Sequence, residues 1–162
     1  MTPAAVFDTV ILLQAGGKPQ GPAGGCLRLV MEDKVLLYMS AAGLAELEDV
    51  LSRERVRKRF PLLTDEHVAT FLRGLRSKVR IVADVPVSFP YPRDPDDEHI
   101  LNLTLAVQAG YLVTRDKDLL DLMQEGNPAG VSFRQHCPEL QILDPIAFLA
   151  AMTPSPPTEA SP

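Results

Sequence analysis

The sequence predicts a single α/β domain with a mainly parallel β-sheet that is covered by helices on both faces. Short apolar runs of strand length alternate with segments of helical spacing along the chain. The length of 162 residues fits one domain that can bury a core without disulfides or a structural metal. No internal repeat interrupts this pattern, and the composition changes only after residue 152.

The first half of the chain carries clear start signals for its helices. Pro22 suits a first helical turn because that turn leaves its N–H groups unpaired, and Ser40 is a typical N-cap. The expected elements are a strand over 4–7, a helical turn over 10–13, a Gly- and Pro-rich loop over 16–25, a helix from Pro22, a strand over 35–39, a helix from Ser40 with Leu44, Leu47 and Leu51 on one face, a basic helix over 53–60 and a helix opened by Thr64.

The second half continues the alternation and ends in a polar tail. Residues 86–95 contain four prolines and are expected to form a loop. The further elements are a strand over 79–82, a helix from Asp96 to Gly110, a strand over 111–113, a short helix over 117–123, short strands over 131–133 and 142–143, and a last helix from Pro145. The Pro-rich end over 153–162 is predicted to be disordered, so the domain spans 1–152.

The composition excludes several classes of protein. No apolar run reaches the roughly 18 residues of a membrane span, and the N-terminus lacks the basic region of a signal peptide, so we expect a cytoplasmic protein. Two cysteines are too few for a disulfide framework. A net charge of −5 disfavours a general nucleic-acid binder, although a carboxylate cluster that binds cations would itself make the chain acidic.

Acidic side chains fall where a parallel sheet builds its site. Asp8 closes the first strand, Ser40 follows the second, and Asp116 follows the strand over 111–113. In a parallel sheet all strands end at the same edge, so these three residues share that edge. Ligands of such sheets bind there, beyond the carboxyl ends of the strands. Glu46 lies about two turns into the helix after Ser40, and Asp97 opens the helix before the strand over 111–113. A tilt of the two helices would bring both acids to the same edge.

Four carboxylates at one edge favour a divalent cation. Packed carboxylates repel one another, and burial makes their ionised forms costly, so a hard cation removes the conflict. Oxygen ligands suit Mg²⁺ or Mn²⁺. Such an ion polarises a phosphoryl oxygen and acidifies water, which is the chemistry of phosphodiester hydrolysis. No serine–histidine or cysteine–histidine nucleophile pattern competes at this edge.

Each acid also has a simpler structural interpretation. Asp116 could cap the helix that follows it, Glu46 could face solvent, and the acids over 94–97 could be first-turn residues favoured by a helix dipole. Asp8 is harder to explain in this way, because an acid that ends an apolar strand does not lie on a solvated face.

One dense basic run stands out in the acidic chain. It follows the helix that carries Glu46 and consists of Arg53, Arg55, Arg57, Lys58 and Arg59. It predicts contacts with RNA phosphates, and the alternative is a solvated helix face.

At this point the motifs resemble those of a known family. The matching stretches, in order, are VFDTVILL at 6–13, PAGG at 22–25, YMSAAGLAELEDVLSR at 38–53, RDPDDEHIL at 93–101 and GYLVTRDKDLL at 110–120. Over about residues 4–150 the chain resembles the PIN-domain ribonucleases, in particular the bacterial branch described as toxins of toxin–antitoxin pairs. DPDD followed by LVTRDKDLL is the most specific part of the resemblance.

The resemblance implies a PIN-like three-layer α/β/α sandwich, metal-dependent endoribonuclease activity, frequent homodimers and a small antitoxin partner. It maps the four metal-binding and catalytic acids to Asp8, Glu46, Asp97 (rather than Asp94 or Asp96) and Asp116. It also implies an accessory acid and three orienting hydroxyl groups, which are Asp118, Thr9, Ser40 and Thr114.

One position departs from the family pattern and keeps a rival open. The family often has Asn where this chain has Val10, and valine cannot hydrogen-bond to a carboxylate or to water. A catalytically weak or inactive PIN-fold interaction module is therefore the alternative. Three other classes fit less well. A phosphatase with Asp8 as nucleophile would need a second acid at position 10, and a receiver domain would need a lysine after a late strand, but this chain has neither. The GPAGG segment also lacks the spacing of a nucleotide-binding loop.

Overall fold

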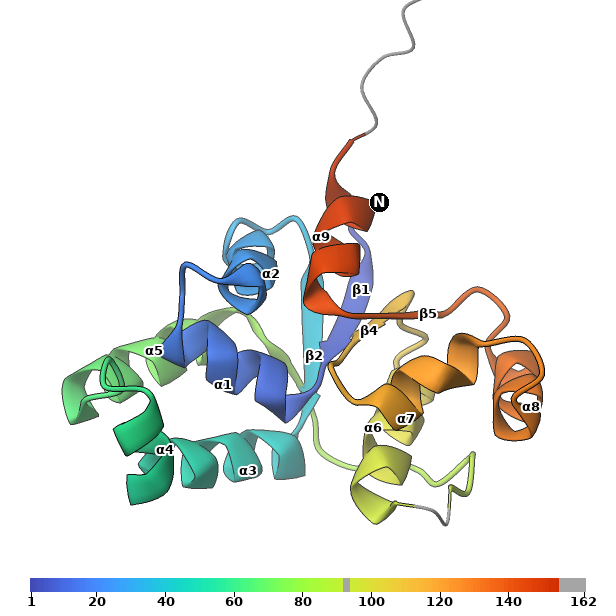
Figure 1. The fold of residues 1–162 in the computed structure, drawn as a ribbon, viewed down its shortest axis with the longest axis horizontal. Helices are drawn as coiled ribbons and strands as arrows, with labels where there is room; N and C mark the ends of the chain where they lie inside the picture. The colour runs from blue at the N-terminus through green and yellow to red at the C-terminus, as the bar shows by residue number, and fades with distance from the viewer. Residues whose placement is uncertain (92–93, 155–162) are drawn as a thin grey trace, which may run out of the picture.

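A five-stranded sheet, all parallel, forms the centre of the protein in the computed structural model, which describes residues 1–91 and 94–154 (Figure 1). The strands are β1 (Ala4–Phe7), β2 (Leu36–Ser40), β3 (Arg80–Val82), β4 (Tyr111–Val113) and β5 (Gln141–Leu143). Their order across the sheet is β3-β2-β1-β4-β5, and Val6 of β1 lies opposite Tyr38 of β2 and Leu112 of β4. The central strand therefore carries Asp8 at its carboxyl end.

Helices cover the sheet on both sides and make a three-layer α/β/α sandwich, as the sequence predicts (Figure 1). The helices on one side are α1 (Thr9–Gly17), α2 (Pro22–Met31), α3 (Ala41–Ser52), α4 (Glu54–Arg59), α5 (Asp65–Lys78) and α9 (Pro145–Met152). Those on the other side are α6 (Pro95–Ala106), α7 (Lys117–Leu120), the 3₁₀ turn η1 (Asp121–Met123) and α8 (Pro128–His136).

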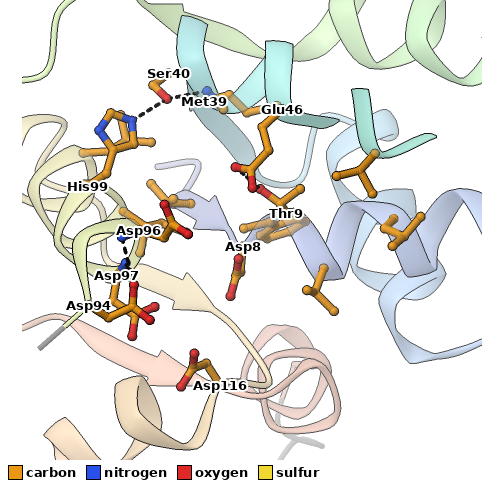
Figure 2. Close-up of a pocket in the computed structure, with 18 residues that line it drawn as sticks. Asp8, Thr9, Met39, Ser40, Glu46, Asp94, Asp96, Asp97, His99 and Asp116 are labelled. Atoms are coloured by element: carbon orange, nitrogen blue, oxygen red, sulfur yellow. Dashed lines mark hydrogen bonds between the residues drawn. The ribbon is translucent and has the colours of Figure 1, made fainter. Parts of the chain in front are cut away.

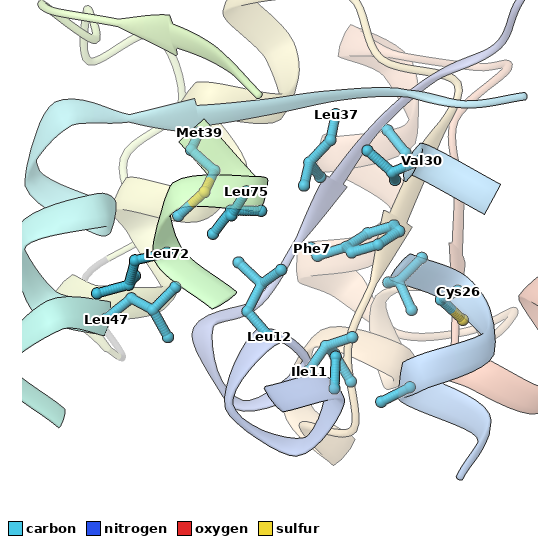
Figure 3. Close-up of a cluster of buried hydrophobic side chains, with 14 of the residues drawn as sticks. Phe7, Ile11, Leu12, Cys26, Val30, Leu37, Met39, Leu47, Leu72 and Leu75 are labelled. Carbon is cyan, nitrogen blue, oxygen red and sulfur yellow. The ribbon is translucent and has the colours of Figure 1, made fainter. Parts of the chain in front are cut away.

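Two hydrophobic clusters lie on the two faces of the sheet. Phe7 packs with Ile11, Leu12 and Leu37 in the cluster beneath α1 and α2 (Figure 3), whereas Val6 joins the cluster beneath α6 and α8. A strand buried on both faces needs apolar residues at every position, which explains the uninterrupted AAVF of β1. Each large side chain fully buried in this way contributes about 1.5–3 kcal/mol.

Two helix starts predicted from the sequence are confirmed by their caps. The hydroxyl group of Ser40 accepts a 2.9 Å hydrogen bond from the Gly43 N–H, and the hydroxyl group of Thr64 accepts one of 3.1 Å from the His67 N–H. Each cap satisfies an N–H that the first helical turn leaves unpaired. The cap at Ser40 also fixes the direction in which α3 leaves the sheet, and with it the position of Glu46.

The predicted strand over 131–133 is wrong, because these residues lie within helix α8. Asn127 caps that helix through the Gly130 N–H at 3.1 Å, and Pro128 occupies its first turn. A three-residue apolar run has too little periodicity to separate strand from helix, so the flanking Asn-Pro was the better signal.

Other boundaries also shift. The loop expected over 16–25 shrinks to 18–21, because α1 continues to Gly17 and α2 begins at Pro22. Gly17 stays helical against the ring of Phe60, where a Cβ would come within 2.5 Å of a ring carbon. The helix expected from Asp96 to Gly110 begins at Pro95 with Asp94 as its cap and ends at Ala106.

Within the described residues, none of the helices is both long and apolar enough to cross a membrane. The predicted disordered tail over 153–162 lies outside the described residues from residue 155 onward.

Candidate active site

The two central strands end side by side and place two acids together. The Thr114 hydroxyl group, at the end of β4, donates a 2.9 Å hydrogen bond to Asp8 Oδ2, at the end of β1. The same Thr114 oxygen accepts a 3.0 Å hydrogen bond from the Asp116 N–H. Thr114 is fully buried and therefore holds both acids in a fixed relation.

Asp97 enters this cluster from the first turn of α6. Its side chain is 6% exposed, and among the described residues its Oδ2 atom is the buried side-chain oxygen without a hydrogen-bond partner. Burial and the negative charges of Asp116, Asp94, Asp8 and Asp118 raise the pKa of Asp97 to about 7. A buried carboxylate oxygen without a donor is costly, so a positively charged or hydrogen-bonding neighbour at this atom would be stabilising.

Asp8 is perturbed in the same direction for related reasons. Burial raises its pKa, and the nearby Asp116 raises it further. The hydrogen bond from Thr114 acts against both effects, because it stabilises the ionised carboxylate. Asp8, Asp97 and Asp116 therefore form a group of mutually repelling acids at the carboxyl ends of β1 and β4.

Glu46 approaches from the opposite wall. It lies on α3 and accepts a 3.4 Å hydrogen bond from the Thr9 hydroxyl group at the start of α1 (Figure 2). Figure 2 shows Asp8 between Glu46 on one side and Asp97 on the other. The two distant acids thus lie on the same pocket as the strand ends, with Glu46 exposed and Asp97 buried.

All four predicted acids line one pocket of about 300 Å³, which we call the acid pocket. That volume has room for a cation with several water molecules, at roughly 30 Å³ for each water. Asp118 is not among the lining residues. Its N–H donates a 2.8 Å hydrogen bond to Asp116 Oδ1, so Asp116 also caps α7 in the way that the simpler interpretation required.

One polar wall of this pocket pairs the predicted Ser40 with His99, which was not predicted from the sequence. Ser40 Oγ and His99 Nε2 are 2.8 Å apart, and both residues line the pocket (Figure 2). Asp96, His99, Ile100 and Leu103 follow helical i, i+3, i+4, i+7 spacing, and all four face the pocket. That spacing was the available signal, once Asp97 had been assigned to the first turn of a helix.

The pocket fits a cation that keeps water ligands. Among the described residues, no group of three or more His, Cys, Asp and Glu side chains is arranged so that it could hold a metal ion by itself. Mg²⁺ in proteins is commonly held by one or two carboxylates together with water and substrate phosphate, so a closed cage is not required. The unpaired Asp97 Oδ2 and the repulsion within the acid group are the features that a divalent cation would relieve.

The basic run over 53–59 is largely occupied by contacts within the protein. Arg53 pairs with Asp49 at 2.7 Å, Lys58 pairs with Glu54 at 3.1 Å, and Arg57 pairs with Asp65. None of the five basic residues lines the acid pocket. Arg59 instead faces the ring of Phe60, with its guanidinium carbon 5.6 Å from the ring centroid.

Comparisons with known proteins agree on the type of domain. A family model described as "PIN domain" matches residues 4–118, a range that includes all four acids. An uncharacterized protein of Methanocaldococcus jannaschii is 29% identical over 120 residues, which are 74% of this chain and 75% of that protein. A chain of the crystal structure of VapBC2 from Rickettsia felis, bound to a DNA fragment from their promoter, has a TM-score of 0.53 and 17% identity, covering 87% of this chain and 98% of that one. At that identity, the structural likeness shows the fold.

Proposed function

This chain belongs to the PIN domain family, and we propose that it is a divalent-metal-dependent endoribonuclease that cleaves RNA phosphodiester bonds in the acid pocket. PIN domains are generally nucleases that use divalent metals. In this chain Asp8, Glu46, Asp97 and Asp116 are the proposed ligands of Mg²⁺ or Mn²⁺.

The observation that carries the proposal is the state of Asp97. Its buried Oδ2 has no donor among the described residues, and it faces a pocket that Asp8 and Asp116 also line. A purely structural acid at a helix start would be exposed or would be satisfied by its own cap, and here the cap is already Asp94, which bonds the Asp96 N–H at 2.9 Å. The arrangement supports a cation site more than a helix cap.

The side chains around the four acids hold these acids in position. A divalent cation bound here would supply positive charge that polarises a phosphoryl oxygen and acidifies water. Thr114 favours the ionised form of Asp8 through its hydrogen bond, and Thr9 orients Glu46 across the pocket. Ser40 and His99 are hydrogen-bonded to each other on the remaining wall, and the polar hydrogen atom that this bond leaves over can bond to a phosphate oxygen of the RNA.

The proposal is tested with purified protein, single-stranded RNA and separate additions of Mn²⁺, Mg²⁺ and EDTA. We expect internal cleavage of the RNA with metal and none with EDTA. A parallel incubation with p-nitrophenyl phosphate separates nuclease from phosphatase activity, and we expect no release of p-nitrophenol. Absence of RNA cleavage with either metal, over a range of RNA sequences, would contradict the proposal.

The inactive interaction module on the same fold is favoured by one observation. Val10 lines the pocket with 45% of its side chain exposed, at a position where the family often has Asn. An apolar side chain there offers no hydrogen bond to a carboxylate or to water. The same incubations with RNA distinguish the two functions, because an inactive module would bind partners without cleaving RNA.

We further propose that the chain is the toxin of a toxin–antitoxin pair, acts in the cytoplasm and forms a homodimer. The structural likeness to a VapBC2 chain supports an antitoxin partner. Expression of wild type and of Asp8→Asn from a tightly controlled promoter tests the toxin role. Growth arrest by the wild type alone would support it, and equal growth of both strains would contradict it. Light scattering of the purified chain gives the oligomeric state.

A further inference from the structure

A second pocket lies at the other end of α1 and is basic. It has a volume of about 170 Å³ and gathers three cationic side chains from three separate segments of the chain, Lys18, Arg59 and Arg115. Gln14 and Phe60 complete its walls, together with the start of α2 at Gly21 to Ala23. We call these residues the basic pocket.

The three cations of the basic pocket have only neutral neighbours among the contacts within the described residues. Lys18 Nζ lies 5.8 Å from the centroid of the Phe60 ring, and Arg59 faces the same ring. Arg115 Nε donates a 2.7 Å hydrogen bond to the Gln14 side-chain oxygen. In the part of the chain that the structure describes, no carboxylate forms a salt bridge with any of the three.

This arrangement is unusual for a chain with a net charge of −5, in which acids outnumber bases. Lys34, Arg53, Lys58, Arg76 and Lys78 all pair with an acid. A helix dipole accounts for a cation at Lys18, which follows the end of α1. The same effect accounts for Arg59, the last residue of α4, but not for Arg115, which comes from the loop after β4. Three like charges around one hollow favour an anion.

The basic pocket is connected to the acid pocket through two segments. Helix α1 lines the acid pocket with Thr9, Val10 and Leu13, and its next residue, Gln14, lines the basic pocket together with Lys18, which follows the end of the helix. The distance along the helix axis from Thr9 to Lys18 is about 13 Å. In the loop after β4, Arg115 lines the basic pocket and the next residue, Asp116, lines the acid pocket.

We propose that the basic pocket binds a backbone phosphate of the RNA whose scissile bond lies in the acid pocket. This inference rests on the proposed ribonuclease function. The acid pocket repels the RNA backbone until a cation is bound, so binding needs positive charge nearby that the acids do not neutralise. The basic pocket supplies this positive charge within a few nucleotides' reach along α1. Because α1 and the 114–116 segment line both pockets, one RNA strand can contact both, and this favours RNA over an acidic segment of a protein partner.

The test uses RNA binding without cleavage. Fluorescence anisotropy in EDTA measures the affinity of the full chain for a labelled 12-nucleotide single-stranded RNA over a series of salt concentrations. The test variant combines Lys18→Gln, Arg59→Gln and Arg115→Gln. The matched control combines Lys34→Gln, Arg73→Gln and Arg80→Gln, which removes the same charge from exposed positions outside both pockets. A third protein with Lys18→Arg, Arg59→Lys and Arg115→Lys keeps the charge, and thermal melts establish that each variant folds.

We expect the test variant to bind RNA at least tenfold more weakly than the control. The slope of log affinity against log salt should fall by about 0.7 for each phosphate that the pocket holds. The charge-keeping variant should retain most of the affinity.

Equal weakening in test and control would overturn the proposal, because net charge alone would then set the affinity. Unchanged RNA binding, with loss of binding to a poly-glutamate peptide, would also overturn it and assign the pocket to a protein partner. If the wild type cleaves RNA with metal but the test variant binds RNA as tightly as the wild type, this inference alone is contradicted. Pocket-dependent RNA binding without any cleavage would contradict the ribonuclease function alone.

Discussion

Thr114 and Asp8 are joined by a 2.9 Å hydrogen bond between side chains that are 106 residues apart in the sequence. The bond connects the carboxyl ends of β4 and β1, the neighbouring strands at the centre of the sheet. Because the same hydroxyl oxygen accepts from the Asp116 N–H, one buried side chain sets the spacing of two of the four proposed metal ligands.

Replacing Thr114 tests this positioning role. Thr114→Val keeps the shape but removes the side-chain donor to Asp8 and leaves the Asp116 N–H without its acceptor, at a cost of about 1–3 kcal/mol of stability for an unpaired buried group. We expect metal-dependent RNA cleavage to fall by at least about tenfold, the rate equivalent of 1.4 kcal/mol. Steady-state kinetics should show the loss in kcat rather than in KM.

Thr104→Val is the matched control, since Thr104 is also buried and, among the described residues, its hydroxyl group donates only to the Ile100 carbonyl of its own helix, at 2.7 Å. It should lower the thermal midpoint without lowering kcat. Thr114→Ser restores the hydroxyl group and should recover activity. Equal kinetic effects of Thr114→Val and Thr104→Val would leave Thr114 with a structural role only.

The raised pKa of Asp97 predicts how stability depends on pH without metal. The folded protein keeps the Asp97 proton up to about pH 7, whereas an unfolded chain releases it near the ordinary value of 3.8. Between these values the folded state binds more protons, so this group's contribution to stability falls as the pH rises from about 4 to about 7. Thermal melts in EDTA should show a midpoint that declines over this range by several degrees more in wild type than in Asp97→Asn.

Asp96→Asn serves as the control, because it removes the same charge from an exposed position in the same helical turn. Its melting profile should follow the wild type. Mn²⁺ must displace the proton of Asp97, so its apparent affinity should also weaken as the pH drops below about 7. A pH profile of Asp97→Asn identical to that of the wild type would show that Asp97 ionises normally.

Val10 offers a gain-of-function test of the acid pocket. Val10→Asn introduces an amide on the pocket wall at an exposed position, so the fold should tolerate it. One added hydrogen bond worth about 1 kcal/mol corresponds to roughly a fivefold rise in kcat. Val10→Thr, which is closest to valine in shape, is the comparison. Lower activity in Val10→Asn would mean that the apolar wall itself is needed.

The sequence predicted most of the fold because its helix caps and apolar strands act locally. Ser40 and Thr64 start helices through bonds to residues three positions along the chain, so sequence spacing was sufficient to find them. The strand predicted over 131–133 was wrong because a three-residue apolar run fits either element, and the helix start at Asn127 and Pro128 decides between them. The burial of Phe133 depends on packing beneath α6 and α8, where its ring centroid lies 5.2 Å from that of Phe89. That contact joins residues far apart in sequence and has no local signature.

The site was predictable to the extent that strand ends determine it. Asp8 and Asp116 follow from the parallel topology alone, whereas Asp97 and Glu46 required the resemblance to a known family. The tilt of α3 and α6 that carries them depends on tertiary packing. The contact of Ser40 with His99 joins two helix starts 59 residues apart, and the contact of Thr114 with Asp8 joins two strand ends. Such pairings appear only once the strand order is known.

The most direct test of a cation site in the acid pocket is the thermal midpoint of wild type and Asp8→Asn, measured with and without Mn²⁺. At a Mn²⁺ concentration a hundredfold above its dissociation constant, binding adds about 2.7 kcal/mol to the wild type, a rise of roughly 5–10 °C for a chain of this size. Asp8→Asn should lose most of this rise and all RNA cleavage. In EDTA its midpoint should equal or exceed that of the wild type, because one charge beside Asp116 is gone. If millimolar Mn²⁺ leaves the thermal midpoint of the wild type unchanged and no metal-dependent cleavage of RNA is found, both the metal site and the nuclease function are contradicted.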